Sequence, residues 1–339
     1  MAKALKNLVT KSKKEKKTSQ AGPDDALAPS DLMALAQSLV NKFTGPQRGR
    51  YSEMYFKRQV VPELRQEAKR NKDIICRILN HLREATLVRF EDRPRATKRD
   101  TAAAGLLYSC ILDKMEPMVV PGFGNCLYHS FGTLVAGRHD QGHHLLMRAL
   151  CLIFILIFPD HVKALIRADA FGEHITELDV EKTYKKICWE IYRVKEWGDK
   201  FSIYAASWIL GRPVHVYWPC FERGFRDYMF DKSKPKGGVE LNRNLASLRQ
   251  AFATAPEKDS PLPEWVSYSA AASYPPTRMP AVIFLYCSHY VPLFCKKNLK
   301  RAEMVEPSLR CWRRELPQIQ QDHPLPQDNN TLLAHFEKL

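Results

Sequence analysis

Apolar residues recur every three or four positions over two stretches of the first hundred residues, which is the spacing of an amphipathic helix. The first stretch starts at Ser30, a suitable N-cap, and ends at residues 44–46, where Thr-Gly-Pro interrupts the pattern. The second starts near Pro62 and ends in the charged, proline-containing segment 91–101. We therefore predict a helical region over residues 30–100, either a module of its own or a lid on the domain after it.

The sequence from residue 101 to residue 295 is denser in apolar residues. Its helical patterns predict helices over residues 101–113, 126–137, 143–158, 160–170, 177–196 and 199–210. Runs rich in β-branched and aromatic residues predict strands over residues 213–218, 281–287 and 289–294. Helices followed by a few late strands are typical of the α/β and α+β classes, so we expect a domain with helices around a small sheet.

The two ends of the chain contain few large apolar residues. Residues 1–29 combine a run of lysines with small and polar residues, which predicts a disordered basic arm. Residues 296–339 end in a stretch rich in Pro, Gln and Asp, which predicts a C-terminal linker or tail, and we interpret residues 221–280 as hairpins and loops. The predicted organisation is thus this arm, a basic helical region over 30–100, a domain over 101–295 and a tail.

The longest apolar run, Leu145 to Phe158, is interrupted by Arg148. A helix needs about 20 apolar residues to cross a bilayer, so this run predicts a buried core helix. The N-terminus has the charge of a signal peptide without the apolar stretch that should come after it. We therefore expect no membrane association.

The distribution of charge adds a candidate partner. The formal net charge is +15, and most of the excess lies in the first hundred residues. Such a cluster indicates a nuclear-import signal, or an acidic partner such as nucleic acid bound through residues 1–100. A solvated, flexible tail explains the same lysine run, and the sequence leaves both interpretations open.

Nine cysteines are scattered along the chain and never form a CxxC pair. This pattern is not typical of a secreted disulfide framework, nor do the Cys and His residues have a recognisable zinc spacing. We therefore expect an intracellular protein of a reducing compartment, the nucleus or the cytoplasm.

The segment with the most informative chemistry is Pro121–Ser130, a glycine-punctuated loop that runs into a helical pattern. Cys126 falls at the predicted helix N-terminus, where free backbone N–H groups and the helix dipole lower a thiol pKa that is otherwise about 8.5. The same N–H groups can bind the oxyanion of a tetrahedral intermediate, in a turn that Gly122 and Gly124 permit. Cys126 is therefore a candidate nucleophile, and a buried structural cysteine is the alternative.

A nucleophilic cysteine needs a base, and His289 is the candidate because it stands between two predicted strands. A histidine at a strand start can reach a helix N-terminus across an α/β core, and such pairs assemble in space regardless of sequence distance. By itself, one Cys and one distant His are weak evidence in a chain with nine Cys and eleven His.

Three segments, in order along the chain, resemble motifs of the ovarian-tumour (OTU) family of cysteine peptidases. Gly122–Ser130 (GFGNCLYHS) resembles the nucleophile motif GDGNCLYRS of that family. Glu196–Ala206 (EWGDKFSIYAA) resembles the family's helix start at Trp-Gly-Asp. Val282–Leu293, which includes His289, resembles the strand pair that presents the catalytic histidine. The resemblance covers about residues 101–295.

The resemblance implies a papain-like OTU fold with Cys126 as the nucleophile and His289 as the base and later the acid. Backbone N–H groups of the nucleophile loop, at Phe123 and Cys126, would bind the oxyanion. The implied reaction is acyl transfer, in which a thiolate attacks an isopeptide carbonyl and water hydrolyses the acyl-enzyme. The implied substrates are conjugates of ubiquitin or a ubiquitin-like protein. The implied reaction requires no metal and no organic cofactor.

Two positions depart from the family's motifs. Phe123 replaces an Asp between the two glycines, and Val291 stands where the family often has an Asp or Asn that orients the histidine. Asp113 and Glu116 are alternative orienting residues. These departures and the basic N-terminal region favour a second hypothesis, a catalytically inactive OTU-like pseudo-peptidase that binds a protein or a nucleic acid.

Overall fold

The computed structural model describes residues 29–45, 52–107, 109–122, 124–138, 142–170, 175–217, 265–270, 278–286, 289–304, 309–310 and 315–337. The predicted arm over residues 1–29 lies outside this set except for Pro29, and so does most of the segment 221–280. Phe123, one of the two predicted oxyanion donors, also lies outside the described residues.

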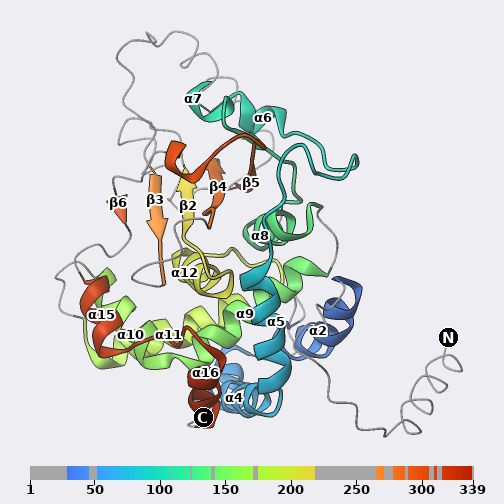
Figure 1. The fold of residues 1–339 in the computed structure, drawn as a ribbon. Coiled ribbons are helices and arrows are strands. Elements are labelled where there is room, and N and C mark those ends of the chain that lie inside the picture. The colour runs from blue at the N-terminus through green and yellow to red at the C-terminus, as the bar shows by residue number, and fades with distance from the viewer. Residues whose placement is uncertain are drawn as a thin grey trace, which may run out of the picture.

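The predicted helical region forms helices between residues 29 and 84. They are α2 (Pro29–Phe43), α3 (Glu53–Tyr55), the π-helical turn η1 (Phe56–Val60), α4 (Val61–Arg70) and α5 (Lys72–Glu84). Ser30 lies inside the first turn of α2, so it is not the N-cap that we predicted. α2 and α4 pack against the long helix α9 (His143–Ile157), so these helices form one body with the rest of the fold (Figure 1).

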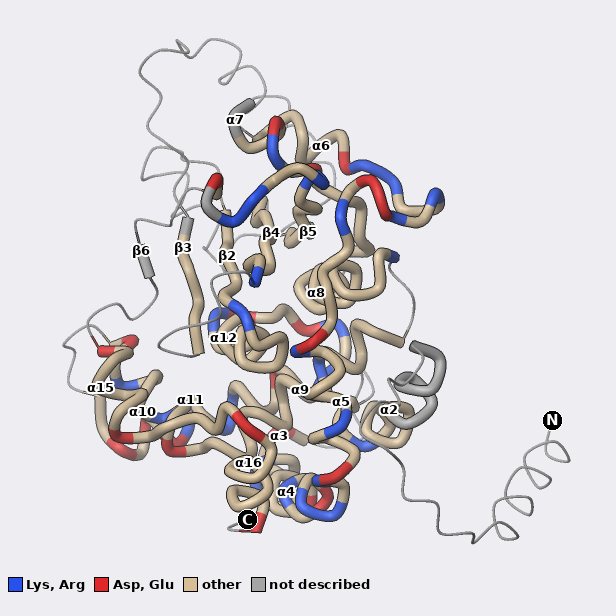
Figure 2. The backbone as a smooth tube through the Cα atoms, viewed as in Figure 1, with Lys and Arg blue, Asp and Glu red and all other residues tan. Residues whose placement is uncertain are grey.

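Charges in this helical region are partly paired. Figure 2 shows Asp and Glu among the Lys and Arg residues of α4 and its neighbours. Glu67 on α4 pairs with Lys42 on α2 and with Arg70 on α4, while Glu337 near the C-terminus pairs with Lys72 on α5. Part of the positive charge of these helices is therefore offset within the fold.

The helices predicted after residue 125 are confirmed, and the one predicted over 101–113 is not continuous. Those after residue 125 are α8 (Cys126–Ala136), α9, α10 (Pro159–Asp169), α11 (Glu177–Tyr192) and α12 (Lys200–Ile209). The segment 101–113 instead forms two short helices, α6 (Thr101–Ala104) and α7 (Ser109–Leu112), followed by strand β1 (Met115–Pro117). The break comes at Gly105, which terminates α6.

The strands form one six-stranded sheet in the order β1-β5-β4-β2-β3-β6. The strands after β1 are β2 (Val214–Tyr217), β3 (Trp265–Tyr268), β4 (Ala281–Tyr286), β5 (His289–Cys295) and β6 (Leu309–Arg310). β4 pairs parallel with β2 and antiparallel with β5, so the three predicted strands are neighbours in the sheet. β1 and β6 were not predicted as strands, because segments of three and two residues carry too little alternation. β3 lies in the segment 221–280, for which we predicted hairpins and loops without placing a strand. The α+β class is confirmed.

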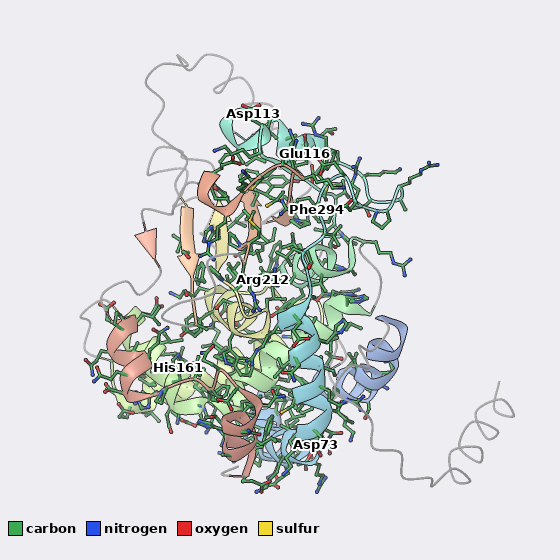
Figure 3. The ribbon with its side chains drawn as sticks, in the orientation of Figure 1. Asp73, Asp113, Glu116, His161, Arg212 and Phe294 are labelled. Carbon is green, nitrogen blue, oxygen red and sulfur yellow. The ribbon has the colours of Figure 1, made fainter. Side chains whose placement is uncertain are left out.

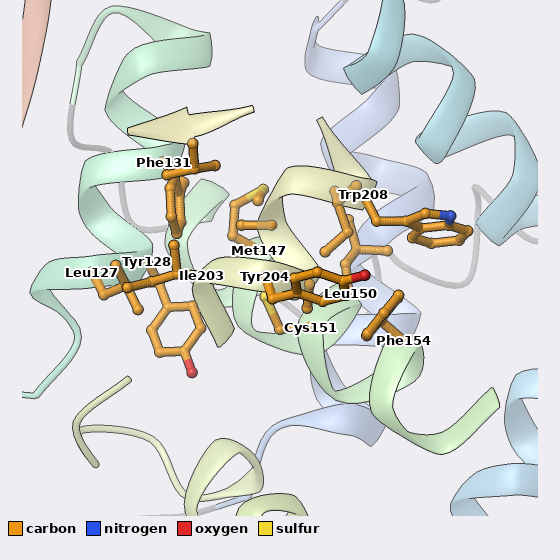
Figure 4. Packing of buried hydrophobic residues seen from close by; sticks show 14 of the residues in the cluster. Leu127, Tyr128, Phe131, Met147, Leu150, Cys151, Phe154, Ile203, Tyr204 and Trp208 are labelled. Carbon is orange, nitrogen blue, oxygen red and sulfur yellow. The ribbon is translucent and has the colours of Figure 1, made fainter. Parts of the chain in front are cut away.

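The prediction of a core helix over the apolar run is confirmed by α9, whose residues from Leu146 to Ile157 are all buried. Figure 4 shows Met147, Leu150 and Phe154 of α9 among side chains of α8 and α12. Because burial of one large apolar side chain contributes about 1.5–3 kcal/mol, this contact anchors α8 firmly. Among the described residues no single helix can span a membrane by length and composition, and only α9 and α10 together, bent by 91°, meet those criteria.

The C-terminal segment differs from the predicted linker or tail. It contains two helices, α15 (Leu316–Asp322) and α16 (Asn329–Glu337). α16 packs on α4 and α5 and buries Leu332 and Phe336 completely. The composition of residues 296–339 indicated a tail because two short helices have little apolar surface of their own, and only packing on the rest of the fold stabilises them.

Candidate active site

The glycine-punctuated loop ends where α8 begins, and Cys126 is the first residue of that helix, as predicted. Asn125 precedes it in the N-cap position without capping α8. The side-chain oxygen of Asn125 instead accepts a hydrogen bond from the backbone N–H of Lys195 at 3.0 Å. The N–H groups of Cys126 and Leu127 act on the thiol and lower its pKa, so Sγ lies among the free donors of the helix N-terminus.

Strand β5 brings the predicted base to the same place. His289 is the first residue of β5, and the backbone N–H of the next residue, Tyr290, donates a hydrogen bond to Cys126 Sγ at 3.4 Å. α8 and β5 also pack against each other. The structure thus brings together two segments whose contacting residues are 164 positions apart in the sequence.

The Cys126 thiol is not an activated thiolate in this conformation. Its side chain is fully buried, and burial raises the pKa of the thiol to about 11. The N–H groups of Tyr290 and Leu127 and the charge of Arg148 lower the pKa, but by less than burial raises it. The prediction of a lowered thiol pKa is therefore wrong for this state, because desolvation outweighs the backbone donors.

The pKa of the His289 imidazole is shifted downward, opposite to that of the Cys126 thiol. Burial lowers its pKa, and the charge of Asp100 raises it by a smaller amount. At neutral pH the two groups are therefore a neutral thiol and a neutral imidazole, and not a preformed ion pair. Nucleophilic chemistry from this state requires a base to take the Cys126 proton as the sulfur attacks.

This protonation state predicts how Cys126 reacts with iodoacetamide. Between about pH 7 and about pH 9 the alkylation rate of the folded protein should rise about tenfold per pH unit, because the thiolate fraction grows by that factor below a pKa of about 11. Peptide mass spectrometry measures the rate at this residue, and Cys126→Ser removes the signal. A rate that is already independent of pH at neutrality would contradict the raised pKa.

A buried carboxylate that the sequence analysis missed lies beside His289. Asp100 accepts one hydrogen bond from the hydroxyl of Tyr286 and one from the backbone N–H of Ala103, each at 2.9 Å. The Tyr286 ring meets the His289 imidazole edge-on, with centroids 5.6 Å apart. Asp100 therefore fixes the ring that His289 contacts, and its charge acts on the imidazole. In the sequence, Asp100 is marked only as a suitable N-cap for a short helix that contains three alanines, and nothing there indicates a role beside His289.

The two acidic residues considered as orienting groups lie elsewhere. Glu116 on β1 is paired with Phe294 on β5, and Phe294 lies about 17 Å from His289 along that strand. Its carboxylate pairs with Arg99 at 2.7 Å. Asp113 is exposed and lies at the same end of the molecule as Glu116 and Phe294 (Figure 3). Neither residue orients His289.

A buried arginine joins the nucleophile loop to the loop after α11. Arg148 on α9 is 0% exposed, and its guanidinium donates to the carbonyl of Gly124 at 3.2 Å. It also donates to four carbonyls at and after the end of α11, those of Glu190, Ile191, Arg193 and Glu196. The guanidinium lies 4.1 Å from the centroid of the Tyr128 ring on α8. Carbonyl dipoles and an aromatic face surround this cation, which has no carboxylate partner among the described residues.

The two loops approach so closely that position 124 requires glycine. Gly124 has φ +79°, and a Cβ there would overlap the carbonyl of Lys195. Lys195 also has a positive φ, 73°, which costs a non-glycine residue about 1 kcal/mol or more. The surrounding hydrogen bonds of Arg148 and Asn125 compensate for this strain. Together they fix the backbone from which Cys126 and its N–H group project.

The second sequence motif supports α8 by packing. Asp199 caps α12 by accepting a hydrogen bond from the Ser202 N–H at 3.0 Å. The Ser202 hydroxyl is in turn hydrogen-bonded to the Tyr128 hydroxyl at 3.0 Å. A Cβ at Gly198 would overlap the Leu127 side chain, so the glycine lets this segment lie directly against the first turn of α8.

Within the part of the chain that the structure describes, no group of three or more His, Cys, Asp or Glu side chains is arranged to hold a metal ion. His144 stacks on His129 of α8, with centroids 3.8 Å apart. This pair joins α8 to α9, and its two side chains are fewer than the three that such a metal site needs.

Comparison with known families gives one match. The model of the OTU-like cysteine protease family matches residues 121–255, so this segment is similar to that family. The match confirms the resemblance that the sequence motifs indicated. It includes Cys126, ends before His289 and spans less than half of the chain.

Two solved structures of viral proteases are also similar to the chain. The viral OTU domain protease from Dera Ghazi Khan virus aligns with a TM-score of 0.32 and 13% identity, over 64% of this chain and 99% of that one. The viral OTU domain protease from Farallon virus aligns with a TM-score of 0.34 and 12% identity, over 55% of this chain and 87% of that one. Both TM-scores are low, so these superpositions do not establish a shared fold by themselves. A search of curated proteins found no match.

Proposed function

We propose that the protein is an OTU-like thiol peptidase that hydrolyses isopeptide conjugates of ubiquitin or a ubiquitin-like protein. The observation that carries the proposal is the hydrogen bond from the Tyr290 N–H to Cys126 Sγ, because it joins the candidate nucleophile to the residue next to the candidate base. The family match over residues 121–255 supports the same chemistry.

The proposed reaction is acyl transfer. His289 takes the proton of Cys126 as Sγ attacks the isopeptide carbonyl, whose oxygen becomes an oxyanion. The N–H group of Cys126 at the start of α8 stabilises this charge. The imidazolium then protonates the departing lysine amine. A water molecule activated by His289 hydrolyses the thioester and restores the thiol.

The second candidate is a catalytically inactive pseudo-peptidase that binds a protein or a nucleic acid. The complete burial of Cys126 and its raised thiol pKa favour it, because substrate must displace surrounding groups before Sγ can react. Val291 is also fully buried and supplies no orienting polar group. In this candidate the basic residues 1–100 bind an acidic partner, in the nucleus or the cytoplasm.

A ubiquitin probe with a thiol-reactive C-terminus distinguishes the two candidates. We expect the wild type to form a covalent adduct at Cys126 with a probe built on ubiquitin or on a ubiquitin-like protein, and Cys126→Ser to form none. Cys76→Ser is the matched control, because burial raises the pKa of that thiol to about 11 as well. A folded wild type that reacts with no probe of either kind would refute the peptidase function.

Asp100 is expected to position the proposed base. Asp100→Asn should lower kcat by at least about tenfold, and by less than the roughly 10⁴-fold seen when a serine triad loses its carboxylate. Because the charge of Asp100 raises the pKa of His289, its loss should move the acid limb of kcat/KM to lower pH. Tyr286→Phe, which keeps the ring and removes the hydroxyl, should have a smaller effect. An unshifted acid limb in Asp100→Asn would assign the residue a purely structural role.

A further inference from the structure

A cavity of about 270 Å³ lies at the end of β5 opposite to His289. The segment Glu84–Arg89 after α5, the residues before β4 and the end of β5 enclose it. Leu293 and Cys295 line the cavity while His289 begins the same strand, so the lining lies about 13 to 20 Å from His289 along β5. The walls are mainly apolar, with five polar or charged lining residues, Glu84, Thr86, Arg89, Arg212 and Arg278.

The three lining arginines donate to backbone carbonyls and to no carboxylate among the described residues. Arg212 donates to the carbonyl of Leu210 at 3.2 Å and to that of Ala85 at 2.5 Å. Arg278 and Arg89 each donate to carbonyls through Nη1 alone. Because a guanidinium has five N–H donors, each of the three has donors left for a ligand.

The charges around the cavity are unbalanced. Arg212 is 3% exposed, and its burial and the charge of Arg278 lower its pKa to about 10. Figure 3 places Arg212 in the interior, near α12. The carbonyl ends of α5 and α12 offset part of this charge. Glu84 is the one acidic lining residue, and it is exposed. An anion between Arg212 and Arg278 would convert the repulsion of these two guanidinium groups into attraction.

We propose that this cavity binds a phosphate monoester, with the phosphate held by Arg89, Arg212 and Arg278. Phosphate fits better than carboxylate because its three terminal oxygens can accept from three guanidinium groups at once. The volume is slightly below the roughly 300–1,000 Å³ of sites for drug-sized ligands, so the ligand is small or only the end of a larger one enters. The apolar walls contact the body of the ligand.

Calorimetric titration with inorganic phosphate, at constant ionic strength in chloride, tests this site. We expect one phosphate per chain, and Arg278→Gln should weaken binding by about tenfold or more, because hydrogen bonds to charged groups are worth about that factor. The matched control is Lys297→Gln, which removes a cation outside the cavity that pairs with Asp92. It should bind phosphate within about twofold of the wild type. Cys126→Ser should bind as the wild type does, which separates this test from that of the peptidase.

A second variant and further ligands complete the test. Arg89→Gln should weaken binding as Arg278→Gln does, and thermal unfolding without phosphate shows that both variants fold. Ribose 5-phosphate, and a short oligonucleotide with and without a 5′-phosphate, distinguish a free small molecule from the end of a nucleic-acid strand. Absence of phosphate binding above the chloride background would overturn the proposal. Equal losses in Arg278→Gln and Lys297→Gln would also overturn it.

Discussion

Cys126→Ala is expected to reduce isopeptide hydrolysis to the uncatalysed level, a loss of about 10⁴-fold or more. The hydrogen bond from the Tyr290 N–H leaves Sγ beside the strand that begins with His289, and Cys126 is the first residue of α8. Without the sulfur no acyl-enzyme forms, and His289 has no proton to accept. The rate of ubiquitin release from a fluorogenic C-terminal amide measures the loss.

His289→Ala should cost nearly as much as Cys126→Ala, and the double variant should be no worse than either, because residues that act as a unit lose their contribution together. Cys76→Ala is the matched control, since its thiol is also buried on a helix and has a similarly raised pKa. It should keep wild-type turnover. Hydrolysis that persists in Cys126→Ala would assign the activity to another residue.

Arg148→Met is expected to lower the free energy of unfolding by about 3–5 kcal/mol, the cost of breaking a buried, hydrogen-bonded charge. The substitution removes the guanidinium donor from five backbone carbonyls, including that of Gly124 in the nucleophile loop, and the Arg193 carbonyl keeps a second donor, the Glu196 N–H at 3.2 Å. Each buried acceptor left unpaired costs about 1–3 kcal/mol, although water and loop movement recover part of this. Urea unfolding at neutral pH measures the change.

The control is Arg167→Met on α10, because Arg167 forms an exposed ion pair with Glu177 that is worth about 1 kcal/mol or less. In addition, Arg148→Met should raise the pKa of the Cys126 thiol further, since the guanidinium charge lowers it. Slower alkylation at every pH detects this shift. Equal stability losses in the two variants, with unchanged alkylation of Cys126, would show that Arg148 does not position the loop.

Local patterns were sufficient to place the parts of the candidate site that local structure creates. The glycines at 122 and 124 and the apolar period after them indicated a loop followed by a helix, and Cys126 is the first residue of that helix. The β-branched runs around residues 282–294 indicated two strands, and His289 begins the second. Helical period, strand period and turn residues are read from neighbours in the sequence, so these features needed no knowledge of the fold.

By itself, then, the sequence determined the helices after residue 125 and the strands β2, β4 and β5, while the choice of Cys126 and His289 needed the resemblance to a family as well. Only the tertiary structure decided the electrostatics, because the pKa of the Cys126 thiol depends on burial by segments distant in the sequence. The same holds for Asp100, which reaches His289 through Tyr286, and for Arg148, whose carbonyl acceptors come from two separate loops. A period of two or 3.6 residues shows which face of an element is buried, but not which distant side chain that face meets.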